Sequence, residues 1–560
     1  MARLLSILCA GVGLLALTAA TSALGEAIPM PPDEAPAPVA SSAIDTTPTG
    51  SIPSAIPAPV AAPLDLAPRI IREPVEGPDE RASGQPELSP PAVAQTPDAP
   101  EDRLTSARPP QGAPDVADAM RAALAAFSAK PAPDVADAQW PRARDGVSAV
   151  YKDRNFAPLW ATMDGFGPSA LKALERLRLA ADDGLDLRHN TLPADDWRPK
   201  DIAEMSAADV ALSGAIVAYA EQASGGRIDP RRLSPIFDLR PEVADAAQAL
   251  ARVAAADDAG STLQGFNPPQ PEYAGLRDML ARLRAAAKDG PDALTTAAPA
   301  TRLAMNAPNS SLPAPPPQVD PNKEIDAVLA NMEMWRWQPR DLGATYVAVN
   351  IADFSLRLVR EGKLALSERV IVGKPATPTN VFSDNIRLIV LNPAWHVPDS
   401  IINKEFLPKL AKDPDYLARH GFETKMVGDK MIVVQPPGAE NALGRILFMF
   451  PNDHAIYLHD TSSRGLFQRD YRALSHGCVR LDQPFQFGAT LLADDPAYAN
   501  YPLEKAIGGA ERTLRLGRQT PIHIQYFTRF VDDSGLLQRR ADLYGLERLV
   551  AGTLFRLRQS

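Results

Sequence analysis

Residues 456–481 read IYLHDTSSRGLFQRDYRALSHGCVRL and contain Cys478. The sequence has two cysteines, and the other, Cys9, lies in an apolar N-terminal segment. A lone cysteine is most often a small buried apolar side chain. Here, however, His459 ends an apolar run that is typical of a β-strand, and His476 lies two residues before the cysteine. The pattern therefore predicts a nucleophilic cysteine and not a structural one.

The residue types around Cys478 suit acyl transfer. A thiol attacks as the thiolate, its ordinary pKa is about 8.5, and a neighbouring imidazolium lowers that pKa. His459 is the candidate for taking the thiol proton and passing it to a leaving amine. Gly477 permits a tight turn that lets nearby backbone N–H groups face an oxyanion. If the segment is extended, Arg480 shares a face with Cys478, where it can hold a carboxylate.

HDT at 459–461 and SHGCVRL at 475–481 together resemble the catalytic signature of the L,D-transpeptidases that have a YkuD-type domain. The flanking segments resemble the larger Gram-negative members of that family: NMEMWRWQPRDLG, VGKPATPTNVFSD, NPAWHVPDSI and LPKLAKDPDYLARHGFE. The resemblance covers about residues 321–530, and more weakly 115–284. Arg480 departs from the broader pattern, in which many members have Asn, but the larger members often carry Arg there.

The resemblance implies a peptidoglycan L,D-transpeptidase that needs no cofactor. Cys478 would be the nucleophile and His459 the proton donor and acceptor. A tetrapeptide stem would acylate the thiol and release D-Ala, and the amine of a second stem would resolve the thioester to a 3→3 cross-link. Carbapenems would acylate the same thiol. The alternatives are water as acceptor (an L,D-carboxypeptidase), an outer-membrane protein amine as acceptor, and, in another class, a non-catalytic wall-binding scaffold.

The neighbouring side chains leave several roles open. His476 can line the oxyanion site with Gly477 or stabilise the loop. Ser475 and Arg480 are candidates for substrate binding, although Ser475 is more simply a residue that hydrogen-bonds the tight turn. His454, His459, His476 and Cys478 have the donor atoms for zinc, but they lack a paired spacing such as CxxC. We therefore predict no metal site.

The N-terminal residues predict export. Arg3 precedes an apolar run to Leu17, and Ala23-Leu24-Gly25 is a small-x-small cleavage site. Cleavage would leave no transmembrane span, and the resemblance places the mature protein in the periplasm. The following Pro- and Ala-rich stretch has almost no aromatic residues and predicts a disordered tether. The net charge is −10, and no basic patch with interleaved aromatics occurs, so nucleic acid is not an expected partner.

The predicted fold is multidomain α+β. A helical scaffold domain is followed by a β-rich catalytic domain, because segments with helical periodicity, such as ADVALSGAIVAYAEQASGG, give way to short strands such as IRLIVLNP. A helical capping insertion is expected at about 400–440. The predicted segments are a signal peptide (1–25), a tether (26–114), the scaffold domain (115–290), a low-complexity linker (291–321), the catalytic domain (322–532) and a basic, amphipathic C-terminal tail (533–560).

Overall fold

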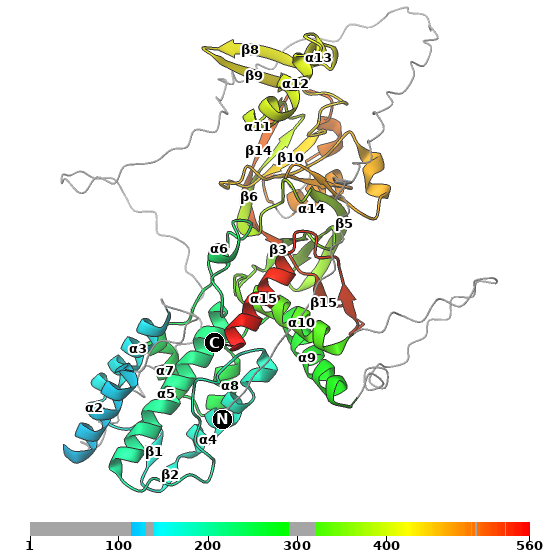
Figure 1. Cartoon of the computed structure of the whole chain (residues 1–560). Helices are drawn as coiled ribbons and strands as arrows, with labels where there is room; N and C mark the ends of the chain where they lie inside the picture. Colours follow the sequence, from blue (N-terminus) through cyan, green and yellow to red (C-terminus); the bar gives the residue numbers. More distant parts are fainter. Residues whose placement is uncertain are drawn as a thin grey trace, which may run out of the picture. The chain divides into compact units, whose positions relative to one another are not determined.

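The computed structural model describes residues 114–129, 139–289, 320–493, 495–498, 501–532 and 534–559. The predicted signal peptide, nearly all of the tether and nearly all of the linker lie outside these residues. Within them, a helical region is followed by a β-rich region, which confirms the predicted α+β architecture (Figure 1).

The helical region is built around α5 (Ile202–Gly225), the helix expected from its apolar periodicity. The Asp201 carboxylate caps its first turn by accepting the Glu204 N–H at 2.8 Å, and Gly226 ends it with a φ of 80°. The remaining elements are α2 (Pro114–Ala129), α3 (Gln139–Asp153), β1 (Ala161–Thr162), β2 (Gly165–Phe166), α4 (Pro168–Arg178), η1 (Ala180–Asp183), α6 (Pro230–Leu233), α7 (Ala246–Ala254) and α8 (Ala259–Gln264). Helices α3, α6, α7 and α8 were not predicted from the sequence.

Helix α5 is also, among the described residues, the one helix that is long and apolar enough to cross a membrane. Its most apolar window is 61% buried inside the protein. Asp209, in the middle of the helix, is fully buried and accepts hydrogen bonds from the Tyr151 hydroxyl (2.5 Å) and the Trp160 N–H (2.7 Å). These contacts are those of a central helix in a protein core.

The β-rich region is built on a nine-stranded sheet in the order β12-β5-β13-β11-β10-β6-β14-β3-β4. The order begins with β12 and ends with β4. Both of these strands pair with the long strand β5, so the two ends of the sheet meet there. The strands are β3 (Thr345–Asn350), β4 (Ser355–Arg360), β5 (Lys363–Gly373), β6 (Phe382–Leu391), β10 (Ile446–Met449), β11 (Leu458–His459), β12 (Ala473–Ser475), β13 (Val479–Leu481) and β14 (Arg512–Gln525). Short helices η4 (Arg464–Gln468) and η5 (Leu503–Ala506) lie in the connections.

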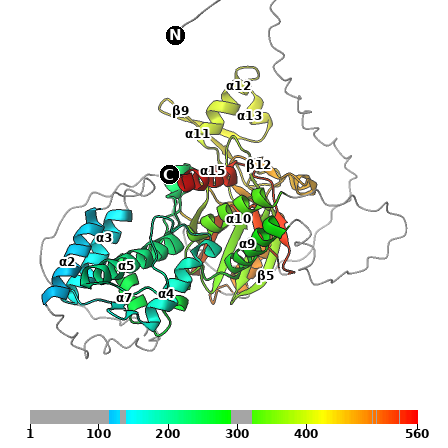
Figure 2. The same ribbon diagram turned by 60° about the horizontal axis from the view of Figure 1, so that its bottom comes forward.

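Four helices accompany the sheet: α9 (Pro271–Asp289), α10 (Pro321–Arg336), α14 (Pro484–Ala493) and α15 (Leu546–Gln559). Helices α9 and α10 lie side by side in both ribbon views (Figures 1 and 2). Leu276 and Leu280 of α9 belong to the same buried cluster as Val347 of the sheet. Helix α9 was predicted as the last helix of the scaffold, yet its apolar face joins the core of the catalytic region.

The C-terminal residues, predicted as an amphipathic tail, also join this core. Strand β16 (Leu537–Arg539) pairs with β15 (Arg529–Val531), and α15 follows. Leu546, Val550 and Leu554 of α15 are each no more than 5% exposed and belong to the sheet's cluster. Because the apolar stripe of α15 is buried against the protein, packing accounts for its amphipathic pattern and membrane binding is not needed to explain it.

The predicted capping insertion has its own small core. Val397, Ile402, Phe406, Leu417 and Val433 form a buried cluster separate from that of the sheet. The insertion is helical only in its first half, because it ends in a hairpin that forms a three-stranded sheet in the order β7-β9-β8. Its elements are β7 (Trp395–His396), α11 (Asp399–Ile401), the π-helix η3 (Ile402–Phe406), α12 (Leu407–Leu410), α13 (Tyr416–Arg419), β8 (Glu423–Val427) and β9 (Lys430–Gln435).

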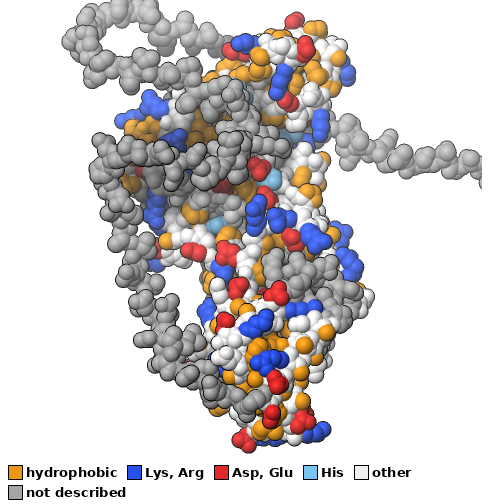
Figure 3. All heavy atoms as spheres, turned by 90° about the vertical axis from the view of Figure 1, so that its left-hand side faces the viewer, with side chains coloured by type: hydrophobic (Ala, Val, Ile, Leu, Met, Phe, Trp, Pro, Cys, Tyr) orange, Lys and Arg blue, Asp and Glu red, His pale blue; other side chains and the backbone are white. Residues whose placement is uncertain are grey.

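Charged side chains of both signs are interspersed on the face drawn in Figure 3. On the parts of this face that are drawn in colour, Lys and Arg side chains lie near Asp and Glu side chains.

Candidate active site

Two neighbouring strands set the geometry of the site. Strands β11 and β13 are parallel, with Leu458 opposite Val479 and His459 opposite Arg480. Successive side chains of a strand point to opposite faces. Leu458 and Val479 are both fully buried in the sheet's core. His459 and Arg480 therefore share the other face of the sheet.

Tyr457 and Cys478 extend the same register by one position. The Val479 N–H donates to the Tyr457 carbonyl at 3.0 Å, which holds the two segments together there. The Cys478 thiol donates to the Ala455 carbonyl at 3.6 Å and also interacts with the hydroxyl of Tyr457, whose ring lies 6.2 Å from that of His459, edge to face. The structure thus brings the predicted nucleophile, the predicted base and Tyr457 onto one face. The sequence analysis did not assign Tyr457 to the site, although its place two residues before His459 is the signal that could have found it.

The backbone around Asp460 orients the His459 ring. The ring is 4% exposed, and its Nδ1 lies 2.5 Å from the Asp460 carbonyl oxygen. A carbonyl only accepts, so Nδ1 carries a proton and Nε2 is the nitrogen that can take another. The Asp460 carboxylate holds the turn by accepting the Arg445 N–H and an Arg464 N–H, each at 3.0 Å.

Burial has the largest effect on the pKa values of both His459 and Cys478. It lowers the pKa of His459 to about 3, helped by the positive charge of Arg480. Burial also raises the pKa of the half-buried Cys478 thiol, against the opposing effect of hydrogen bonds from Tyr457 and of the charge on Arg480. The sequence argument expected an imidazolium that lowers the thiol pKa. The structure instead places the imidazole and the thiol on one face of the sheet, where burial lowers the pKa of His459 and raises the pKa of Cys478, so both groups favour their neutral forms.

Arg480 is largely buried beside the thiol. Its Nε has no hydrogen-bond partner in the described part of the chain. Burial lowers the pKa of its guanidinium, while the charge of the Cys478 thiolate raises it. A buried guanidinium nitrogen without a partner costs free energy unless another group satisfies it. This cation is therefore suited to an anion that forms or binds at the cysteine.

The turn that carries the cysteine is held by Ser475. Its hydroxyl donates to the Cys478 carbonyl at 2.5 Å and accepts the Gly477 N–H at 3.2 Å. Gly477 has a φ of 123°, a conformation open to glycine. Ser475 is 2% exposed, so its side chain has little surface to offer a substrate. Its contacts agree better with the predicted role of hydrogen-bonding the tight turn than with substrate binding. The Gly477 N–H already donates to the Ser475 hydroxyl. The backbone N–H of Cys478 lies close to the sulfur of the same residue.

His476 points away from this turn toward the insertion. Its Nε2 lies 2.7 Å from Oε1 of Glu405, in the π-helix η3, and 3.3 Å from Nζ of Lys374. It is exposed, so the loop-stabilising alternative agrees with its contacts better than a place in the oxyanion site. Glu405 and Lys374 lie 71 and 102 residues away in the chain, and no local sequence signal joins them to the cysteine.

Two other histidines, His454 and His523, have partners outside this site. His454 pairs with Asp238 at 3.0 Å, and His523 hydrogen-bonds the Leu342 carbonyl at 3.0 Å. Across the described residues, no three His, Cys, Asp or Glu side chains lie together as metal ligands would.

The comparisons with known proteins agree with the signature. Residues 344–498 match the model of the L,D-transpeptidase catalytic domain (YkuD), and residues 145–280 match that of the Scaffold domain. The "Putative L,D-transpeptidase" of Haemophilus influenzae is 30% identical over 223 residues, which cover 36% of this chain and 45% of that protein. The chain therefore spans less than half the length of this curated relative.

Similar solved structures include two L,D-transpeptidases. One is from Mycobacterium smegmatis, with 15% identity, a TM-score of 0.18, and coverage of 32% of this chain and 58% of that one. The other is the catalytic domain of the Enterococcus faecium enzyme, with 17% identity, a TM-score of 0.14, and coverage of 32% and 95%. From its matches to the two family models, the chain carries an L,D-transpeptidase catalytic domain of the YkuD type together with a Scaffold domain.

Proposed function

We propose that the protein is a peptidoglycan L,D-transpeptidase that forms 3→3 cross-links through a thioester on Cys478. The observation that carries the proposal is the common face of Cys478, His459 and Arg480 on two neighbouring strands within the matched catalytic domain. This face supplies a nucleophile, a base and a cation for the developing charge.

In the first half-reaction, the Cys478 sulfur attacks the carbonyl carbon of the third residue of a tetrapeptide stem. The thiol proton passes to Nε2 of His459 as the S–C bond forms. The C–N bond to D-Ala then breaks, and the leaving amine takes the proton from Nε2. Burial gives the His459 imidazolium a pKa of about 3, which favours release of this proton to the amine and disfavours its uptake from the thiol.

In the second half-reaction, the side-chain amine of an acceptor stem attacks the thioester. Its C–N bond forms, the C–S bond breaks, and the amine proton returns to the thiolate through His459. Arg480 stabilises the thiolate at both ends of the cycle, and its unpartnered Nε is available to a stem carboxylate. We further propose that the reaction takes place in the periplasm, as the predicted signal peptide implies.

The alternatives share this site. Water as acceptor would make the protein an L,D-carboxypeptidase, and a protein amine as acceptor would attach an outer-membrane protein to the wall. A non-catalytic wall-binding scaffold is the alternative of another class, and the intact arrangement of His459 and Cys478 argues against it.

The test is to incubate the purified protein with a disaccharide-tetrapeptide and to analyse the products by mass spectrometry. A cross-linked dimer that has lost one D-Ala is the expected product, and Cys478→Ala should abolish it. Tripeptide alone would identify water as the acceptor. An unchanged tetrapeptide, with no imipenem adduct on Cys478, would contradict an enzymatic role.

A further inference from the structure

We propose that Tyr544, in the C-terminal segment, is a positioning residue for Cys478. Its hydroxyl fixes the loop 373–379, and this loop in turn fixes the peptide that precedes the cysteine. The inference rests on the proposed function and adds to it a residue that lies outside the matched catalytic domain, which ends at residue 498.

Thr379 connects Tyr544 to the nucleophile, and Gly373 binds both Thr379 and Tyr544. The Tyr544 hydroxyl donates to the Gly373 carbonyl at 2.5 Å and accepts the Thr379 N–H at 3.2 Å. The Thr379 hydroxyl accepts the Gly373 N–H at 2.9 Å and donates to the Gly477 carbonyl at 2.6 Å. The Gly477 carbonyl belongs to the peptide bond whose nitrogen is that of Cys478. Thr379 is therefore the single residue between the tyrosine and the nucleophile's own peptide.

The loop between these residues has little room to adjust. A Cβ at Gly373 would lie 2.3 Å from the Thr377 carbonyl oxygen and 2.7 Å from the Thr379 nitrogen, so the backbone folds tightly on itself. Thr379 is fully buried. Water cannot easily replace a hydrogen bond lost there, and the loss is correspondingly costly. We therefore expect that loss of the Tyr544 hydrogen bonds shifts the backbone of the loop 373–379, because water cannot take their place.

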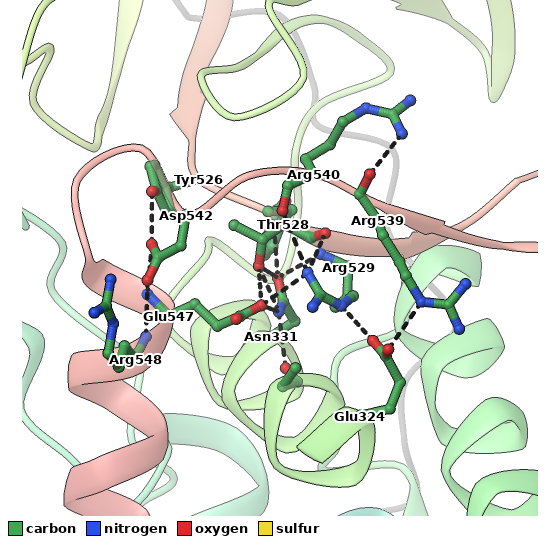
Figure 4. Close-up of polar contacts among 12 residues, drawn as sticks. Glu324, Asn331, Tyr526, Thr528, Arg529, Arg539, Arg540, Asp542, Glu547 and Arg548 are labelled. Atoms are coloured by element: carbon green, nitrogen blue, oxygen red, sulfur yellow. Dashed lines mark hydrogen bonds and ion pairs between the residues drawn. The ribbon is translucent and has the colours of Figure 1, made fainter. Parts of the chain in front are cut away.

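The segment that carries Tyr544 is itself held firmly, as Figure 4 shows. The Asp542 carboxylate accepts the Tyr526 hydroxyl at 2.7 Å and, at 3.1 Å each, the N–H groups of Glu547 and Arg548 at the start of α15. The Tyr526 oxygen accepts the Tyr544 N–H at 2.9 Å, and the two tyrosine rings stack at 5.6 Å. Backbone and ring of Tyr544 are thus both fixed.

A second set of contacts joins the segment to α10 (Figure 4). Asn331 of α10 is fully buried, and its side-chain oxygen accepts the N–H groups of Thr528 (3.0 Å) and Arg529 (3.2 Å). Glu324 of the same helix binds Arg529 and also accepts from Arg539 at 2.8 Å. Such a buried network specifies one conformation when all its groups are satisfied. The C-terminal segment therefore acts as a rigid support behind the active-site turn.

The test compares Tyr544→Phe, which keeps the stacked ring and removes the hydroxyl, with the control Tyr346→Phe. Tyr346 lies on β3, where its ring packs edge to face against that of His523 at 5.8 Å. The readouts are the rate constant for acylation of Cys478 by imipenem, the rate of thiol alkylation by iodoacetamide, and Tm. We expect Y544F to acylate about tenfold more slowly, as expected for one lost hydrogen bond in the reacting geometry. Its alkylation rate should change little, and its Tm should fall by a few degrees because the Gly373 carbonyl and the Thr379 N–H lose a buried partner. Y346F should match the wild type in acylation and alkylation.

A double-mutant cycle tests whether Tyr544 acts through Thr379. Thr379→Val removes the shared hydroxyl, and the double variant Y544F/T379V should acylate no more slowly than the worse single variant. Thr379→Ser keeps the hydroxyl and should restore most of the rate. If Y544F proves too unstable to assay, the contrast between T379S and T379V tests the same connection from its other end.

The outcomes separate the two proposals. Y544F acylated as fast as the wild type, or fully additive losses in the cycle, would overturn the role of Tyr544 alone. Wild-type protein that forms no adduct with imipenem and no product from the tetrapeptide would overturn the proposed function itself.

Discussion

His459 and Arg480 are register partners on adjacent parallel strands and lie on the same face of the sheet. The positive charge of Arg480 lowers the pKa of His459, and it also favours the thiolate of Cys478. One cation thus acts on both partners of the proposed proton transfer. It makes the histidine a stronger acid and a weaker base, and it favours the thiolate of the cysteine.

Arg480→Gln should raise the pKa values of both His459 and Cys478. At pH 7, we expect acylation of Cys478 by imipenem to slow by roughly tenfold, which corresponds to about 1.4 kcal/mol. The pH profile of thiol alkylation by iodoacetamide should shift to higher pH. Arg515→Gln is the matched control, because Arg515 is exposed on β14. An unshifted alkylation profile in R480Q would show that the guanidinium does not act on the thiol.

His459 should make stability depend on pH. Its pKa of about 3 lies below the ordinary 6.5, so the unfolded state binds more protons than the folded state between these two values. Its contribution is therefore fully present above pH 6.5 and lost as the pH falls toward 3, up to about 4–5 kcal/mol. Unfolding by urea at several pH values, in wild type and in His459→Gln, measures the difference. The gap in stability between the two proteins should narrow as the pH falls, and a gap that stays constant from pH 7 to pH 4 would contradict the prediction.

Glu368 of β5 should have the opposite pH dependence. Burial raises its pKa to about 7, and its Oε1 has no hydrogen-bond partner among the residues described. Its contribution is fully present below pH 4.5 and lost as the pH rises through 7, by about 3 kcal/mol. Glu368→Gln keeps the shape and cannot ionise, so we expect its Tm relative to wild type to be higher at pH 8 than at pH 5. An equal Tm difference at both pH values would be the contrary result.

Gly444 should be needed for the turn that orients His459. A Cβ there would lie 2.4 Å from the Asp460 side chain, and its φ is 65°. Gly428, in the hairpin turn of the insertion, has a similar φ of 60° with nothing within 4 Å of an added Cβ. Both alanine variants incur backbone strain of about 1–2 kcal/mol. Only Gly444→Ala should also slow the acylation of Cys478.

Measuring Tm and the rate of imipenem acylation for Gly444→Ala and Gly428→Ala separates two effects. Backbone strain lowers Tm in both variants, whereas displacement of the Asp460 turn slows acylation only in Gly444→Ala. Equal losses of stability, with unchanged acylation in both variants, would mean that the Asp460 turn tolerates the added methyl group and that His459 keeps its orientation.

The sequence by itself indicated the candidate site residues and the order of the helical and β-rich regions. His459, Gly477 and Cys478 lie in one short stretch, and the apolar runs of α5 and α10 are local properties of the chain. Of the predicted strand AIYLHD, only Leu458–His459 forms a strand, and the turn SHGC precedes β13. Strand alternation and turn chemistry depend on near neighbours, which is why a sequence pattern can indicate them.

Only the tertiary structure decided how these residues are charged and what supports them. The low pKa of His459 depends on its burial and on Arg480 across a strand pair. The contact of His476 with Glu405 and the hydrogen bonds from Tyr544 through Thr379 to Gly477 join segments 71 to 171 residues apart. The same holds for α9 and α15, whose apolar stripes show that they are buried but not in which core. The hydrophobic effect is non-directional, so an apolar stripe in the sequence shows that a helix is buried. It does not show which distant part of the chain covers the stripe, and that partner is set by the packing of the whole fold.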